Sequence, residues 1–182
     1  MMRLITNFTI SLQNRFFMIY QHALIICLAE EQDIHGILAI QNECKLSVWS
    51  ASQYREEIKK SSSLVVVARF EGKTIGFLAT HLSKSLNLSE KVLNYTQADV
   101  LNFGIINKFQ KQRIGTLLLE KFFALTARMN LEAVWLEVRE SNLKAINFYQ
   151  KKGFVKTQIR KNFYRDPLEN AALMKLDLPV LP

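Results

Sequence analysis

The feature that most constrains the fold is a strand, a helix and a second strand that follow one another within residues 98–138. Residues 98–106 and 133–138 are rich in apolar and β-branched residues and predict the two strands. Residues 113–129 predict the helix, because apolar side chains recur at helical spacing: Ile114, Leu117, Leu118, Phe122, Leu125 and Met129. Such a unit requires parallel strands and a right-handed crossover, so it predicts a parallel pair inside the sheet.

The first half of the chain predicts a strand, two helices and a hairpin. Residues 23–29 are apolar and predict a strand, and the acidic run at 30–33 favours the start of a helix. A second helix is predicted over 50–60. The runs 64–70 and 74–80 predict a hairpin whose turn contains Gly72, which supplies a positive φ.

The second half adds a helix and a final pair of strands. Residues 82–96 are polar and irregular, and we predict a long connection there. Residues 142–152 predict a helix that Gly153 ends as its C-cap. Residues 154–163 and 171–178 predict an antiparallel pair. The whole pattern predicts a mixed sheet with helices on both faces.

Size and composition suit one globular domain over residues 23–182, preceded by an N-terminal extension over residues 1–22. The chain has 182 residues, of which 49% are hydrophobic and 22% charged. An apolar stretch near the N-terminus is interrupted by Gln21 and His22 and is too short to span a membrane. A signal peptide remains an alternative. We therefore expect a cytoplasmic protein without a membrane partner.

Charge, cysteines and histidines narrow the function classes. The net charge of +8 is scattered, which favours a solvated surface over a specific nucleic-acid patch and leaves an anionic cofactor or acidic partner open. Cys27 and Cys44 lack CxxC spacing, so free thiols in a reducing compartment are favoured over a disulfide or a nucleophile. The histidines lack metal-binding spacing, so we predict no metal site.

The connection at residues 107–116 is a candidate anion site. It leads into a helix, whose first backbone N–H groups and positive dipole end attract anions. Lys111 and Arg113 add positive charge, and Gly115 allows close approach of a ligand. A pyrophosphate would fit here, although this spacing alone also occurs in ordinary basic loops.

Several segments together resemble the GNAT family of N-acetyltransferases. Residues 110–115 (QKQRIG) resemble its acetyl-CoA loop, Q/R-x-x-G-x-G/A, with Arg113 where the family usually has Gly. Residues 135–142 and 145–154 resemble the next strand and the helix N-x-x-A-x-x-x-Y-x-x-x-G-F. Residues 159–164 (IRKNFY) resemble the RimI-type ribosomal-protein alanine N-acetyltransferases. The match is ordered from about residue 102 to residue 178 and weaker over 23–81.

This resemblance implies the GNAT acyl-CoA N-acyltransferase fold and acetyl-CoA as co-substrate. The fold is a mixed, mostly antiparallel sheet of about seven strands with a splayed central parallel pair and helices on both faces. The resemblance implies that the pantetheine arm pairs with the backbone of Phe103, Gly104 and Ile105. It also implies that Asn142 contacts the cofactor and that one loop holds the pyrophosphate, namely Lys111, Gln112, Arg113, Ile114, Gly115 and Thr116.

Two side chains are candidates for the proton transfers. Trp135, Glu137 and Arg139 share one face of their strand, and the resemblance makes Glu137 the general base. The alternative is a structural ion pair of Glu137 with Arg139 or a cation of a neighbouring strand. Tyr149 matches the family's general acid, which protonates the departing CoA thiolate. The alternative is a core tyrosine with a satisfied hydroxyl.

The acceptor follows only from the subgroup resemblance. It implies transfer to a protein N-terminal amine, that of a ribosomal protein beginning with alanine, with Arg160, Asn162 and Tyr164 shaping the acceptor pocket. An ordinary hairpin with polar edges would explain these three residues equally. Because the subgroup has a shorter connection than 82–96, which should border the acceptor side, a lysine, polyamine or small amine also remains an acceptor. Arg113 leaves open a non-catalytic acyl-CoA-binding module.

Overall fold

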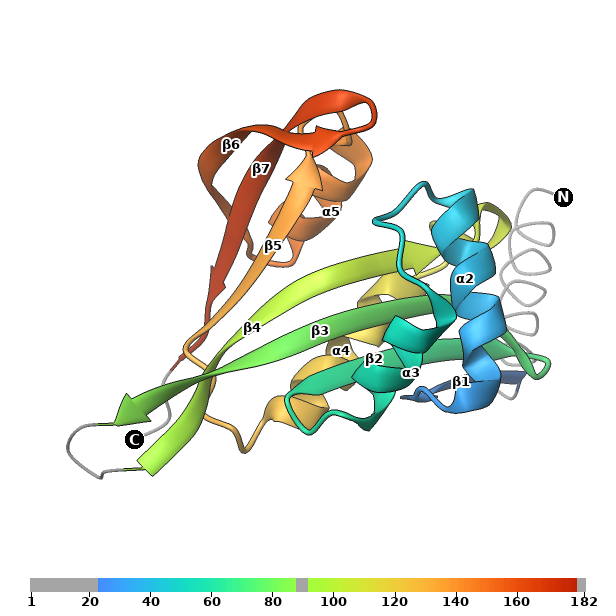
Figure 1. Cartoon of the computed structure of the whole chain (residues 1–182), viewed down its shortest axis with the longest axis horizontal. Coiled ribbons are helices and arrows are strands. Elements are labelled where there is room, and N and C mark those ends of the chain that lie inside the picture. Colours follow the sequence, from blue (N-terminus) through green and yellow to red (C-terminus); the bar gives the residue numbers. More distant parts are fainter. Residues whose placement is uncertain (1–22, 88–91, 180–182) are drawn as a thin grey trace, which may run out of the picture.

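The computed structural model describes residues 23–87 and 92–179, which share one seven-stranded sheet in the order β1-β2-β3-β4-β5-β7-β6 (Figure 1). All neighbouring strands are antiparallel except β4 and β5, which are parallel. This arrangement confirms the predicted mixed, mostly antiparallel sheet with one central parallel pair. Within the described residues, no helix is long and apolar enough to cross a membrane.

The elements follow the predicted order. The first half contains β1 (Leu24–Leu28), the short 3-10 helix η1 (Glu31–Asp33), α2 (Ile34–Glu43), α3 (Ala51–Lys59), β2 (Ser63–Phe70) and β3 (Lys73–Asn87). The second half contains β4 (Val92–Ile105), η2 (Asn107–Phe109), α4 (Ile114–Thr126), β5 (Ala133–Arg139), α5 (Leu143–Lys151), β6 (Val155–Arg165) and β7 (Leu168–Asp177).

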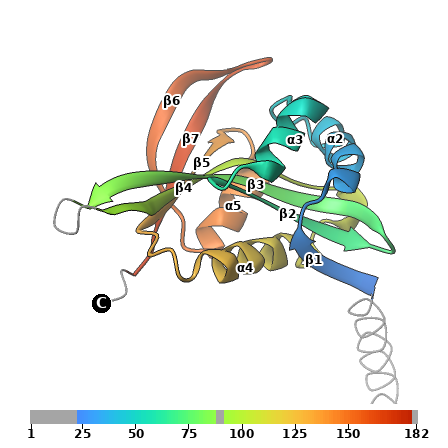
Figure 2. The same ribbon diagram turned by 60° about the horizontal axis from the view of Figure 1, so that its bottom comes forward.

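The helices cover both faces of the sheet, as predicted. Figure 2 shows α2 and α3 on one face, and α4 and α5 on the other. Each face has its own core of buried apolar side chains, one containing Ile37, Ile40 and Phe77 and the other Leu118 and Phe122. The sheet is therefore a two-sided platform that separates two layers of helices.

Local signals determine where the helices begin and end. Ser50 caps α3: its hydroxyl accepts from the Gln53 backbone N–H at 3.2 Å, and the Gln53 side chain accepts from the Ser50 N–H at 2.8 Å. At the end of α5, Gly153 takes a φ of 90° one residue beyond the C-cap Lys152. The N–H of Phe154 then bonds the carbonyl of Tyr149 at 3.0 Å, which closes a Schellman motif.

The structure corrects our prediction of an irregular connection over 82–96, apart from residues 88–91, which lie outside the described residues. β3 and β4 continue as a paired ribbon beyond the rest of the sheet, with Leu82 opposite Ala98 and Asn87 opposite Val92 (Figure 1). The ribbon leaves the sheet at the end away from the C-terminus of β4. It therefore does not border the region where β4 and β5 separate, contrary to our expectation that it borders the acceptor side. A protruding ribbon needs no alternating apolar face, so the sequence lacked the usual strand pattern.

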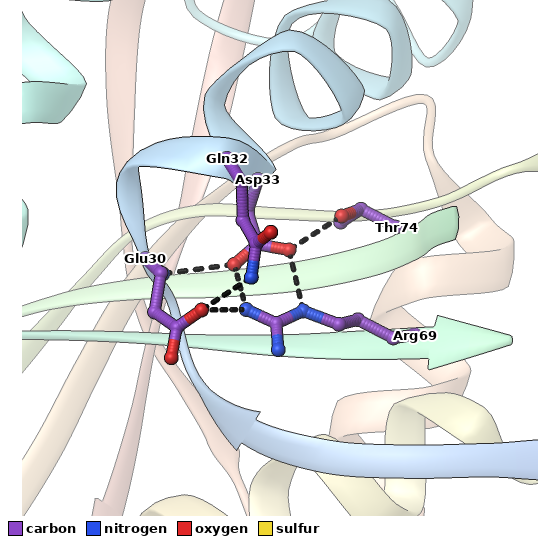
Figure 3. Close-up of polar contacts among 5 residues, drawn as sticks. All are labelled: Glu30, Gln32, Asp33, Arg69 and Thr74. Carbon is purple, nitrogen blue, oxygen red and sulfur yellow. Dashed lines mark hydrogen bonds and ion pairs between the residues drawn. The ribbon is translucent and has the colours of Figure 1, made fainter. Parts of the chain in front are cut away.

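A buried ion pair joins the start of α2 to the β2–β3 hairpin (Figure 3). Asp33 is 2% exposed and accepts from the Arg69 guanidinium at 2.5 and 2.8 Å and from the Thr74 hydroxyl at 2.7 Å. Burial alone would raise the pKa of Asp33, but the bonds from Arg69, the Glu30 backbone and Thr74 together hold it below its ordinary value. The carboxylate therefore fastens the first helical layer to the sheet.

Candidate active site

A cleft opens where the two parallel strands separate. Only residues Gln97 to Val100 of β4 pair with β5, where their partners are Ala133 to Leu136. Beyond these residues the two strands diverge (Figure 1). A cavity of about 610 Å³ lies between the diverging ends. Its walls are the loop before α3, the open edge of β4, the end of β5, the first two turns of α5 and the β6–β7 turn. Backbone groups of the two parted strands thus face a space that a ligand can enter.

The open edge of β4 presents backbone groups of alternating residues. The N–H of Ile106 donates to the carbonyl of Ile75 at 2.9 Å, so Gly104 is also directed toward β3 by the alternation of an antiparallel ladder. The backbone groups of Phe103 and Ile105 therefore face away from β3: Phe103 lines the cleft, and the Ile105 carbonyl accepts from the Cys44 thiol at 3.3 Å and from Gln110 at 3.0 Å. The backbone of Gly104 thus faces β3 and not the cleft. Its lack of a side chain allows α2 and the following loop to pack closely on β4, because a Cβ there would lie 2.8 Å from their side chains.

The loop before α4 forms a cradle of backbone N–H groups. Lys111 and Arg113 both adopt the left-handed conformation, with φ of 60° and 66°, and both side chains are exposed. Arg113 is the N-cap residue of α4, and no described side chain caps this helix, so the first-turn amides of Ile114, Gly115 and Thr116 point outward. The left-handed φ gives the physical reason for the family's glycine at this position.

The cradle adjoins the open edge of β4. A Cβ on Gly115 would lie 3.2 Å from the Ile105 side chain and 3.4 Å from the Phe103 ring. Gly115 therefore permits close packing of the first turn of α4 against β4. The Gln112 side chain is turned back onto the loop, where its amide donates to the Lys108 carbonyl at 2.9 Å. The predicted pyrophosphate and pantetheine residues thus lie on adjoining surfaces.

Glu137 lines the cleft from β5. Trp135, Glu137 and Arg139 are partly exposed and alternate with buried residues, which confirms the predicted shared face. Oε1 of Glu137 accepts from Nη1 of Arg160 at 2.6 Å, and the two side chains are 29% and 48% exposed. An ion pair of Glu137 therefore exists, but its partner is Arg160 of β6, which β7 separates from β5, and is neither Arg139 nor a cation of an adjacent strand.

Tyr149 also lines the cleft, from α5, and is 7% exposed. Its ring packs against Phe103 and Phe154, with centroids 6.1 and 5.6 Å apart. Burial, together with the nearby phenol of Tyr164, raises the pKa of Tyr149 well above its ordinary range. The hydroxyl is therefore protonated at neutral pH.

Asn142 is placed at the start of α5, as predicted, and lines the same cleft. Its side-chain oxygen accepts from the Ala145 N–H at 3.1 Å, so it caps the helix.

The three predicted acceptor residues on β6 have different positions. Tyr164 lines the cleft, and its hydroxyl donates to the Glu137 carbonyl at 3.4 Å. Arg160 contacts Glu137 and also lies 4.7 Å from the centre of the Phe163 ring. Asn162 is exposed at a bulge of β6 with a φ of 53°, and its N–H donates to Asn170 at 3.1 Å. Asn162 is not among the residues that line the cleft.

A buried polar network holds the loop before α3 and was not predicted. The Tyr54 hydroxyl donates to Gln41 at 2.9 Å and accepts from Asn102 at 3.2 Å. The Gln41 side chain bonds both the N–H and the carbonyl of Trp49, and Asn102 donates to the Ser47 carbonyl at 3.2 Å. Asn102, a single polar residue within the apolar part of β4, was the sequence signal for this network, which sets one wall of the cleft.

No metal ligands gather in the described part of the chain, where no group of three or more His, Cys, Asp or Glu residues is arranged to hold an ion. Cys27 and Cys44 are free thiols, as predicted. Burial raises the pKa of both thiols, which keeps them protonated.

Several known proteins are similar to this chain in sequence and in fold. The [Ribosomal protein bS18]-alanine N-acetyltransferase of Haemophilus influenzae is 40% identical over 154 residues, 82% of this chain and 96% of that protein. An N-alpha-acetyltransferase of Sulfurisphaera tokodaii is 30% identical over 125 residues, 68% of this chain and 74% of that protein. The crystal structure of the ribosomal-protein-S18-alanine N-acetyltransferase from Escherichia coli gives a TM-score of 0.72 at 25% identity and covers 87% of this chain and 96% of that one.

The model of the acetyltransferase (GNAT) family matches residues 34–154 of this chain. These residues include the two diverging strands β4 and β5, the loop before α4, and α5. This match confirms the predicted fold, the predicted class of enzyme and the predicted acetyl-CoA co-substrate. The chain therefore belongs to the acetyltransferase (GNAT) family, whose members are N-acetyltransferases.

Proposed function

We propose that this protein transfers acetyl from acetyl-CoA to the N-terminal α-amine of a protein, with a ribosomal protein beginning with alanine as the acceptor. The observation that carries the proposal is the Haemophilus influenzae relative, because that enzyme is named for this reaction and 96% of its length aligns at 40% identity. The Sulfurisphaera relative is also named for N-terminal acetylation, which supports the α-amine more generally. A ribosomal acceptor would place the enzyme in the cytoplasm.

The donor half of the proposed site lies beside α4 and α5. The outward N–H groups of the cradle would hold the pyrophosphate, with charge from Lys111 and Arg113. The backbone groups of Phe103 and the N–H of Ile105 would pair with the pantetheine arm as a further strand would, whereas the Ile105 carbonyl already accepts from Cys44 and Gln110. Gly104 assists by letting the α2 layer approach β4, and Asn142 contributes from the start of α5.

The acceptor half lies between the loop before α3 and the β6–β7 turn. The amine nitrogen attacks the thioester carbonyl, the new C–N bond forms and the C–S bond breaks. Glu137 takes the proton that the amine loses; because Oε1 is bound to Arg160, we assign this proton to Oε2. Tyr149 gives its proton to the departing thiolate, and solvent restores it. Tyr164 borders this half, Arg160 would act on it through its bond to Glu137, and Asn162 would shape its wall through the β6 bulge.

One reason to consider a different acceptor was the long segment 82–96. If it bordered the acceptor side, it would favour a lysine, a polyamine or a small amine as the acceptor. Its described residues, 82–87 and 92–96, pair at the far end of β4 and do not line the cleft. We also propose that residues 23–182 form the catalytic domain and residues 1–22 an extension of it.

A panel of acceptors tests this proposal. The full chain is incubated with acetyl-CoA and peptides that begin with alanine, serine, methionine or a charged residue, together with a polyamine and with lysine peptides whose N-termini are blocked. Mass spectrometry then locates the acetyl group. We expect acetylation of the α-amine of alanine peptides and none on lysine. Acetylation confined to lysine or to a polyamine would refute the proposed acceptor, and absence of transfer to every amine would refute the activity.

A further inference from the structure

One arginine in the cleft has a set of contacts that the proposed chemistry does not use. Arg139 lies two residues after Glu137, on the same face of β5. Within the described residues it forms no ion pair with Glu137, which is bound to Arg160. Its guanidinium instead reaches across to the hairpin that follows β6, and its side chain is 25% exposed.

Arg139 holds the β6–β7 turn through four contacts. Nη2 donates to the Asp166 carbonyl at 2.8 Å, and Nη1 donates to the Pro167 carbonyl at 3.3 Å. Nη1 also pairs with Oε2 of Glu169 at 3.1 Å, and the guanidinium carbon lies 4.2 Å from the centre of the Tyr164 ring. Only the planar fork of an arginine can bond two carbonyls and a carboxylate while it stacks on an aromatic ring.

The contacted residues form the wall of the cleft opposite the loop before α3. Tyr164, Asp166 and Pro167 all line the cavity, and so does Arg139 itself. The other oxygen of Glu169 accepts from the Ser141 N–H at 2.7 Å, just before Asn142. Arg139 therefore connects the acceptor wall, the strand of the proposed base and the start of α5.

From this arrangement we infer that Arg139 is a positioning residue for the acceptor: it sets the β6–β7 turn at the distance from β5 that a peptide N-terminus requires. The inference rests on the proposed function, since the acceptor is taken to be a peptide. The positive charge of Arg139 is compensated by Glu169 and by the two carbonyls. Arg139 thus acts through the turn and does not touch the reacting atoms.

Three full-length variants test the inference. Arg139→Met keeps much of the side-chain length but removes the charge and every donor, and Arg139→Lys keeps the cation over Tyr164 but loses the fork. Lys156→Met is the matched control, because its surface ion pair with Glu140 lies outside the cleft and both side chains are 41% exposed. Steady-state kinetics with the preferred peptide give kcat and KM for peptide and for acetyl-CoA.

We expect Arg139→Met to raise the peptide KM about tenfold, while kcat and the acetyl-CoA KM stay within about twofold, because none of the four contacts of Arg139 reaches the loop before α4 or the edge of β4. Arg139→Lys should recover part of the loss, and Lys156→Met should behave as the wild type. A peptide KM that is unchanged in Arg139→Met, or an equal rise of the KM for both substrates, would overturn the inference.

A second measurement separates this inference from the proposed function. Amide hydrogen exchange, followed by mass spectrometry on the same variants without substrate, does not depend on turnover. In Arg139→Met we expect faster exchange over residues 164–170 and unchanged exchange over residues 44–50. Equal exchange over 164–170 in variant and wild type would overturn the positioning role. A wild type that acetylates no peptide would instead refute the proposed function alone.

Discussion

Replacement of Arg113 by glycine should stabilise the fold and weaken acetyl-CoA binding at the same time. The backbone of Arg113 has a φ of 66° and a ψ of 0°, a left-handed conformation that is strained for any residue with a Cβ. The side chain is exposed and adds a positive charge beside the outward N–H groups of α4. The backbone of Arg113 therefore lowers the stability of the fold, whereas its side chain strengthens acetyl-CoA binding. A substitution by glycine changes both quantities.

The magnitudes follow from these two features. The left-handed conformation costs a non-glycine residue about 1–2 kcal/mol, and glycine loses about 0.5–1 kcal/mol more on folding through its backbone freedom. The difference is a net stabilisation of about 0.5–1 kcal/mol, or about 1–4 °C in Tm for a chain of this size. Loss of one exposed cation near a phosphate should cost roughly 0.5 kcal/mol of binding, which is about a twofold rise in the Kd of acetyl-CoA.

Two matched variants separate the contributions. Arg113→Ala removes the charge but keeps a Cβ in the left-handed conformation, so it should weaken binding equally without raising Tm. Glu71→Gly relieves a φ of 49° in the β2–β3 turn, away from the cleft, so it should raise Tm without changing the Kd. Differential scanning calorimetry and isothermal titration calorimetry give the two quantities. A lower Tm for Arg113→Gly, or tighter binding of acetyl-CoA, would refute the reasoning.

Three further substitutions test the roles of single side chains. Glu137→Gln should lower the single-turnover transfer rate about 10²–10⁴-fold with an unchanged Kd for acetyl-CoA; an unaltered rate would remove Glu137 as the base. Tyr149→Phe should slow the same step about tenfold or more, and full activity would show that the hydroxyl is only a packing feature. Asp33→Asn should destabilise the protein by about 3 kcal/mol at pH 7, because the charge of Arg69 loses its buried partner. Because the folded-state pKa of Asp33 is lowered, this stabilisation is present above its ordinary pKa of about 3.9 and is lost as the pH falls below it. Urea unfolding of variant and wild type from pH 7 to pH 3 should therefore give a shrinking difference, and a constant difference would contradict the assignment.

Local patterns were enough to predict most elements and their order. The apolar periodicity over 113–129 predicted α4, and Gly153 was correctly placed at the end of α5, because these signals depend on neighbours within one or two turns. The ordered motifs from residue 102 onward were enough to identify the family, since loop, strand and helix are contiguous in sequence. The paired residues 82–87 and 92–96 were missed because strands that protrude from the sheet need no apolar face.

The sequence by itself therefore determined the fold class, the parallel pair and the family, because each is encoded in short-range periodicity or in contiguous motifs. Only the tertiary structure decided which groups meet in the cleft. Glu137 pairs with Arg160 and Arg139 with Glu169, because β7 lies between β5 and β6 and sets the register of side chains that are 23 and 30 residues apart. The Gln41, Tyr54 and Asn102 network likewise joins two helices to β4. Such contacts depend on strand order and register, which cooperative packing of the whole chain selects and no local pattern specifies.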